Sequence, residues 1–144
     1  MKNSKHRYPI IYIAGTGHCG STALELCLCS HKEIVGVGEI NHVLKINDPD
    51  ELEKQYHNKK MTSGRMMIED SYWKGFYKIH KDILDKPYLE RYKIHYDYFR
   101  EIHGDKIMVD SSKYVSIMES LQPLFKKGLI FPVFLLKDVR SSTY

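Results

Sequence analysis

The sequence predicts an α/β domain of three layers, in which a central parallel β-sheet is flanked by helices. Short apolar runs rich in β-branched residues alternate along the chain with segments of helical pattern. Such strand–helix–strand units join parallel strands through right-handed crossovers. With 144 residues, of which 42% are hydrophobic, the chain is long enough to bury one core. We therefore expect a single domain over residues 1–144.

Four apolar runs are the predicted strands. Residues 9–14 (PIIYIA) are bounded by Gly15 and fit a strand that is buried on both faces. Residues 34–37 form a brief second strand, residues 106–109 (KIMV) a third, and residues 129–136 (LIFPVFLL) the most apolar one. Together these runs supply the strands of the expected sheet.

Helical pattern fills much of the chain between these strands. Residues 21–30 predict a helix, and residues 114–125 predict a second one that is interrupted near Pro123. Residues 50–103 are helical in pattern and rich in charge, with an aromatic stripe at helical spacing that is more typical of a core than of a binding site. Residues 47–71 are polar and poorly patterned, and we expect the mobile insertion there. The aromatic stripe consists of Tyr88, Tyr92, Tyr96 and Phe99.

Composition excludes several classes of protein. The net charge of +4 suits an anionic ligand, but no stripe of lysine and arginine indicates a nucleic-acid groove. No apolar run is long enough to span a membrane. The basic, polar residues 1–7 lack the apolar stretch of a signal peptide, and the three cysteines fit reduced thiols rather than a zinc site. We expect a cytoplasmic location and no bound metal.

A glycine-rich loop that follows the first strand and precedes a helix is the strongest chemical signal. Glycines allow tight backbone turns that expose N–H groups, and a helix N-terminus adds its positive end. This combination predicts a phosphate-binding loop and a P-loop-like domain. Its residues are Gly15, Thr16, Gly17, His18, Cys19, Gly20, Ser21 and Thr22.

The loop departs from an ordinary nucleotide-hydrolysing P-loop at one position. Four residues separate Gly15 from Gly20, as in a Walker A motif, but Ser21 stands where an ATPase or GTPase places its lysine. Without this cation, the loop lacks the group that reaches the β- and γ-phosphates. A nucleotide kinase or NTPase with a degenerate loop, which would use ATP and Mg²⁺, therefore becomes the alternative rather than the first hypothesis.

These features resemble those of the sulfotransferases that use 3′-phosphoadenosine 5′-phosphosulfate (PAPS). The similar pattern is an apolar strand, Gly-x-Gly-x-x-Gly-[Ser/Thr]-Thr, a helix, and Gly38-Glu39 after the second strand. Residues 109–113 (VDSSK) resemble the segment after the family's third strand, and residues 134–140 (FLLKDVR) resemble its 3′-phosphate motif. Residues 47–104 match no motif of the family.

The resemblance implies a role for several residues in sulfuryl transfer from PAPS to a hydroxyl or amine. Glu39 is the implied base, and His42 is the alternative because other members use a histidine; a glutamate at a helix start is also typical of simple capping. His18 stands where many members have lysine or arginine, and its imidazole would donate one hydrogen bond to the phosphosulfate on the leaving-group side, while Lys113 would supply the missing cation. The other donors to the phosphosulfate would be Gly15, Gly17, Cys19, Gly20, Ser21 and Thr22.

The motif at residues 134–140 concerns the binding of the 3′-phosphate and indicates how far the domain extends. Lys137 takes the position of the family's first arginine, with the charge but without the bidentate fork. The family's serine would fall just past Tyr144, so we expect the domain to be incomplete at its C-terminus. The acceptor, a carbohydrate, tyrosine or small molecule, stays open, as do the oligomeric state and a non-catalytic, nucleotide-binding role.

Overall fold

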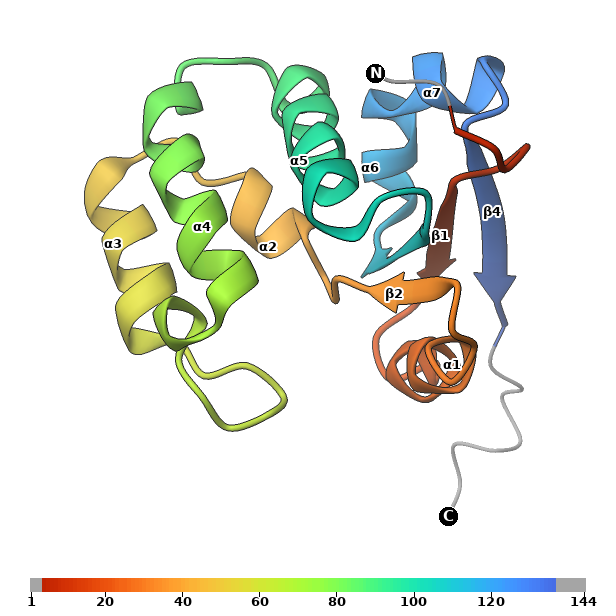
Figure 1. Ribbon diagram of the computed structural model, residues 1–144, viewed down its shortest axis with the longest axis horizontal. Coiled ribbons are helices and arrows are strands. Elements are labelled where there is room, and N and C mark those ends of the chain that lie inside the picture. Colours follow the sequence, from red (N-terminus) through yellow and green to blue (C-terminus); the bar gives the residue numbers. More distant parts are fainter. Residues whose placement is uncertain (1–3, 137–144) are drawn as a thin grey trace. The chain divides into compact units, whose positions relative to one another are not determined.

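The computed structural model describes residues 4–136 and divides them into two compact units (Figure 1). The sheet unit holds residues 4–41 and 105–136, and the helical unit holds residues 42–104. The helical unit is thus an insertion in the sequence between the second and third strands of the sheet unit. The sequence shows no composition shift at either junction, and the single domain expected from it stays a prediction.

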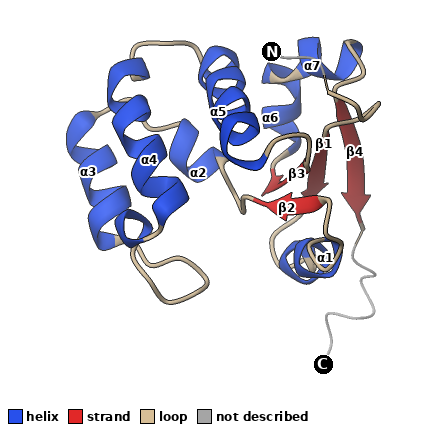
Figure 2. Ribbon diagram, in the orientation of Figure 1, coloured by secondary structure: helices blue, strands red, loops and turns tan. Residues whose placement is uncertain are grey.

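The sheet unit contains four parallel strands (Figure 2). They are β1 (Ile10–Gly15), β2 (Ile34–Gly36), β3 (Ile107–Lys113) and β4 (Ile130–Leu135), in the spatial order β2-β3-β1-β4. All four predicted strands are present, and the α/β class with a parallel sheet is confirmed. The third strand continues four residues beyond the predicted end at Val109.

Helices cover the sheet on both faces. The path from β1 through α1 (Ser21–Leu28) to β2 passes β3 in one direction, whereas the path from β3 through α6 (Val115–Ser120) and α7 (Gln122–Lys126) to β4 passes β1 in the other. Because such crossovers are right-handed, α1 lies on one face and α6–α7 lie on the other. The three-layer architecture and the predicted helix interruption before Pro123 are both confirmed.

The core of the sheet unit is centred on β1, which has a strand on each side. Ile10, Tyr12 and Ile13 are fully buried, as is Met108 on the adjacent β3. Tyr12 keeps its polar end satisfied, because its hydroxyl donates to the carbonyl of Tyr114 at 2.8 Å. Burial on both faces explains why this strand is apolar throughout.

The helical unit is built from α3 (Pro49–Asn58), α4 (Ser71–His80) and α5 (Tyr88–His103), preceded by the short α2 (Asn41–Leu44), whose first residue belongs to the sheet unit. Two 3₁₀ turns, η1 (Met67–Glu69) and η2 (Lys81–Ile83), flank α4. The aromatic stripe of α5 is confirmed as core. Its fully buried members are Tyr92, Tyr96 and Phe99.

The expectation of a poorly patterned insertion over residues 47–71 is wrong for its first half, which forms α3. Asp48 caps this helix by accepting a hydrogen bond from the Glu51 N–H at 2.9 Å, and Pro49 occupies its first turn. Leu52 and Tyr56 then lie one turn apart and are both buried. The helix is short and highly charged, so these local signals outweigh its polar composition.

A buried arginine ties the loops of the helical unit together. The guanidinium of Arg91 donates to the carbonyl oxygens of Leu44, Ile46, Leu84 and Lys86 at 2.6–2.9 Å. The carbonyls at the ends of α2 and η2 would otherwise lack helical partners. This side chain therefore fixes the segments that follow α2 and η2 to α5.

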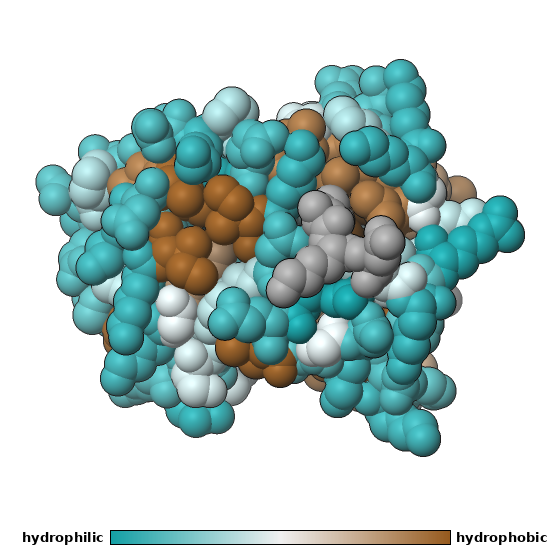
Figure 3. Space-filling view, turned by 45° about the horizontal axis from the view of Figure 1, so that its top comes forward, coloured by the Kyte–Doolittle hydropathy of each residue, from teal (hydrophilic) through white to brown (hydrophobic). Residues whose placement is uncertain are grey.

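The surface carries no sign of a membrane-spanning segment in the described residues. No helix within residues 4–136 combines the length and the apolar character needed to cross a bilayer. The face shown in Figure 3 is mostly hydrophilic, with apolar side chains gathered in a few patches. The compartment stays a prediction from the sequence.

Candidate functional site

The carboxyl edge of the sheet carries the candidate site. In open parallel sheets, ligands bind at this edge between adjacent strands whose connections leave toward opposite faces. Here β1 and β3 are adjacent, and their connections run to α1 on one face and to α6 on the other. The predicted phosphate loop, residues 15–22, starts at the end of β1 and continues into the first turn of α1 at this point.

The loop adopts a backbone suited to binding an anion. His18 and Gly20 are both in the left-handed region, with φ of 58° and 90°, and Cys19 lies between them. Turns with left-handed residues of this kind direct successive N–H groups into a concave cradle. Thr16, Gly17 and His18 are exposed, so a ligand has access to the loop from solvent.

The glycines of the loop differ in what a side chain at each position would meet. A Cβ at Gly15 would lie 2.8 Å from the sulfur of Cys19 and 3.1 Å from the carbonyl oxygen of Leu135, so a larger residue would force these neighbours to shift. Gly20 needs its freedom because of its positive φ. A Cβ at Gly17 would meet nothing within 4 Å, so this glycine leaves open space above the loop instead of serving the packing.

The start of α1 completes the cradle. Gly20 is the N-cap residue, so no side chain caps the first turn, and that turn contains no acidic residue. Its N–H groups and the positive end of the helix dipole are thus available to an anion. Ser21 is buried and Thr22 is exposed, which places one hydroxyl inside the turn and the other at the surface.

Two of the predicted catalytic residues contact each other at this edge. Glu39, three residues after β2, and Lys113, the last residue of β3, form a partly buried ion pair. Lys113 is also in register with Ala14, the residue just before Gly15, and it has a left-handed φ of 72°. The structure therefore brings segments from three strands together: the loop after β1, Glu39 and Lys113.

A glutamate that sequence reasoning missed organises the same edge. Glu25 on α1 accepts a hydrogen bond from the Gly38 N–H at 2.8 Å and another from the Ser111 hydroxyl at 2.5 Å. Any side chain at Gly36 would collide with this carboxylate. Glu25 thus fixes the backbone just before Glu39. The sequence carries no local signal for this role, because the two partners of Glu25 lie 13 and 86 residues away along the chain.

The end of β3 is fixed by a second, fully buried network. The backbone N–H and the hydroxyl of Ser112 both donate to the carboxylate of Asp110, and the Ser112 oxygen accepts from the Asn41 N–H at 3.0 Å. Ser111 and Ser112 are therefore engaged inside the protein. Of the segment 111–113, Lys113 is the residue that contacts Glu39.

The remaining predicted residues lie on the loop, in the helical unit or outside the described residues. His18 is exposed on the loop itself, and Cys19 is half-buried beneath it. His42, the alternative base, belongs to the helical unit, where it lines a surface hollow. Lys137, predicted to contact the 3′-phosphate, lies outside the described residues.

Within residues 4–136, no three side chains of His, Cys, Asp or Glu are grouped so that they could hold a metal ion. Comparisons with protein-family models, with curated proteins and with solved structures give no match. The site combines an exposed glycine-rich turn at the start of α1 with a carboxylate that is paired with an ammonium group.

Proposed function

We propose that this chain binds PAPS through the loop at residues 15–22 and transfers its sulfuryl group to a hydroxyl or amine. The observation that carries the proposal is the contact between Glu39 and Lys113, with Lys113 in register beside the start of the loop. These residues belong to segments that resemble the same family, and they are far apart in sequence. Convergence of such segments on one edge supports a shared site.

The cradle would hold the 5′-phosphosulfate. N–H groups of the loop and of the first turn of α1 suit the phosphate oxygens, and Thr22 offers an exposed hydroxyl. The loop has no lysine for β- and γ-phosphates, and this absence favours a shorter anion over a triphosphate. Exposed His18 can donate one further hydrogen bond from its imidazole.

The reaction needs a base on one side of sulfur and donors on the other. The acceptor oxygen or nitrogen forms a bond to sulfur, while the bond from sulfur to the bridging phosphate oxygen breaks. The acceptor's proton goes to the carboxylate of Glu39, and the leaving group is adenosine 3′,5′-bisphosphate. Negative charge that develops on the bridging oxygen is stabilised by N–H groups and by a cation.

Lys113 is the residue suited to supply that cation. Its register with Ala14 places it beside the loop, and its ammonium group already contacts the proposed base. One side chain would thus both orient Glu39 and stabilise the leaving oxygen. Glu39 is the preferred base because it belongs to the sheet unit, as the loop does. His42 belongs to the helical unit and stays the alternative base.

A transfer assay tests the roles of these residues. Sulfate transfer from radiolabelled PAPS to a panel of hydroxyl and amine acceptors is measured for the chain and for Glu39→Gln. We expect a loss of about 10²–10⁴-fold for this variant, the usual contribution of a general base. Glu119→Gln, at an exposed position on α6, is the matched control and should keep full activity.

Two outcomes would redirect the assignment. Full activity of Glu39→Gln with inactivity of His42→Gln would make His42 the base. Full activity of both variants would remove the proposed acid–base role from this edge of the sheet.

A further inference from the structure

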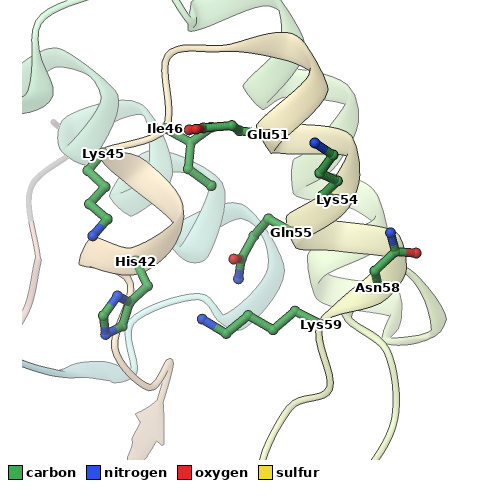
Figure 4. Close-up of a pocket in the computed structure, with 8 residues that line it drawn as sticks. All are labelled: His42, Lys45, Ile46, Glu51, Lys54, Gln55, Asn58 and Lys59. Atoms are coloured by element: carbon green, nitrogen blue, oxygen red, sulfur yellow. The ribbon is translucent and has the colours of Figure 1, made fainter.

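The helical unit has a surface hollow of about 460 Å³ between α2 and α3 (Figure 4). Its lining belongs entirely to this unit, so the hollow is distinct from the phosphate loop. The volume is within the usual range for small-molecule sites. The lining residues are His42, Lys45, Ile46, Glu51, Lys54, Gln55, Asn58 and Lys59.

The lining is strongly cationic. It contains three lysines against one glutamate, and its histidine adds a further nitrogen donor or acceptor. Within the described part of the chain, Lys45, Lys54 and Lys59 form no ion pair with a carboxylate. Like charges that converge on one hollow repel each other and favour an anion between them.

The side chains differ in direction. Figure 4 shows Lys45, Gln55 and Lys59 extending into the space next to His42, whereas Lys54 and Asn58 point away from it. The convergent groups come from both sides of the hollow, because Lys45 directly follows α2 and Lys59 directly follows α3. A ligand there would be contacted from two elements at once.

The backbone that carries these groups is held in place. Ile46 is buried at the base of the hollow, and Leu52 and Tyr56 anchor α3 in the core of the unit. The amide of Gln55 donates to the sulfur of Met67 at 3.2 Å, so this side chain is also oriented. Positively charged groups on a fixed frame lose less entropy when they bind.

We infer that this hollow binds a small molecule through a tetrahedral oxyanion group, a sulfate or phosphate ester. Lysine ammonium groups are point-charge donors suited to such oxygens. Apart from the imidazole of His42, the lining has no aromatic ring on which a nucleobase could stack. The hollow exceeds the size of the anionic group alone, which leaves space for the remainder of the ligand. This inference does not depend on the proposed sulfuryl transfer.

An NMR titration with inorganic sulfate and inorganic phosphate tests the site on the full chain. At constant ionic strength, set with sodium chloride, we expect saturable shifts of the Lys45 and Lys59 backbone amides. Lys59→Glu and Lys45→Glu should each weaken binding about tenfold or more, the effect of losing one charge-assisted hydrogen bond. Acetate, a planar monoanion, should bind more weakly than either tetrahedral anion.

Lys74→Glu on α4 is the matched control, because it makes the same charge change in the same unit at an exposed position outside the lining. It should leave the affinity unchanged. The amide signals of buried Leu52 and Tyr56 report whether each variant stays folded. Shifts that grow linearly without saturation, or an equal loss in Lys74→Glu, would overturn the inference, since either result indicates general charge screening.

Discussion

Lys113 forms an ion pair with Glu39 across a separation of 74 residues in the sequence. The contact joins the last residue of β3 to the segment that follows β2. Lys113 is also in register with Ala14, which directly precedes the glycine loop. Nothing in the sequence next to either residue indicates that the other is its partner. Their contact is therefore the relationship on which the account of the site depends.

Replacing Lys113 by asparagine tests this contact without disturbing the backbone. Asparagine tolerates the left-handed φ of 72° at this position, so the change removes the ammonium group without adding backbone strain. We expect sulfate transfer to fall at least tenfold, while the free energy of unfolding changes by about 1 kcal/mol or less, as for a partly exposed ion pair. Activity assays and urea denaturation measure the two effects. Unchanged transfer would contradict the role given to Lys113.

Gly20 and Gly17 are predicted to respond differently to alanine. Gly20→Ala forces a Cβ into a left-handed conformation, which costs about 1–2 kcal/mol of stability. Gly17→Ala meets no atom within 4 Å and should leave the stability within about 0.5 kcal/mol. If an anion lies over the loop, Gly17→Ala nevertheless weakens its binding. Equal stability losses in the two variants would refute the loop conformation.

Glu25 is predicted to be a structural support of the site. Glu25→Gln leaves a similar shape but turns one acceptor into a donor, so it cannot accept from both the Gly38 N–H and the Ser111 hydroxyl as the carboxylate does. We expect a loss of about 1–3 kcal/mol in the free energy of unfolding. Glu119→Gln, on an exposed helix face, should change it by less than about 0.5 kcal/mol. Chemical denaturation of both variants makes the comparison.

Two buried histidines predict that acid destabilises the helical unit. Burial lowers the pKa of His95 to about 3 and that of His80 to about 4, from an ordinary value of 6.5. Both rings are therefore neutral when folded, whereas the unfolded chain takes up protons below about pH 6.5. The free energy of unfolding falls as the pH drops through this window, by about 2.5 kcal/mol between pH 7 and 5.5 for both sites together.

Urea denaturation at several pH values measures this effect. Lys74→Gln is the control, because Lys74 is exposed on α4 of the same unit and the change removes no histidine, so the pH dependence should stay the same. A free energy of unfolding that is equal at pH 7 and pH 5.5 would contradict the burial of these rings as neutral groups.

The sheet could be predicted from the sequence because its signals are local. Apolar, β-branched runs mark strands, and the loop that starts at Gly15 marks the change from strand to helix. The last part of β3 was missed for a non-local reason. Asp110, Ser111 and Ser112 are polar but buried, and their partners Glu25 and Asn41 come from other parts of the chain.

The helical unit shows the opposite case, in which a local signal was present and was outweighed by composition. Asp48 and Pro49 mark a helix start, and Leu52 and Tyr56 follow at the spacing of one turn. The buried Arg91 could not be foreseen, because it binds carbonyl oxygens, which every residue has. Within the candidate site, the loop could be predicted from the sequence. The pairing of Glu39 with Lys113 could be seen only in the folded structure.

The most direct test of the central claim is a calorimetric titration of the chain with adenosine 3′,5′-bisphosphate and, separately, with ATP and Mg²⁺. We predict saturable binding of the bisphosphate that weakens at least tenfold in Lys113→Asn, and much weaker binding of ATP with Mg²⁺. Tighter binding of ATP with Mg²⁺ than of the bisphosphate would contradict the account and favour a nucleotide kinase or NTPase.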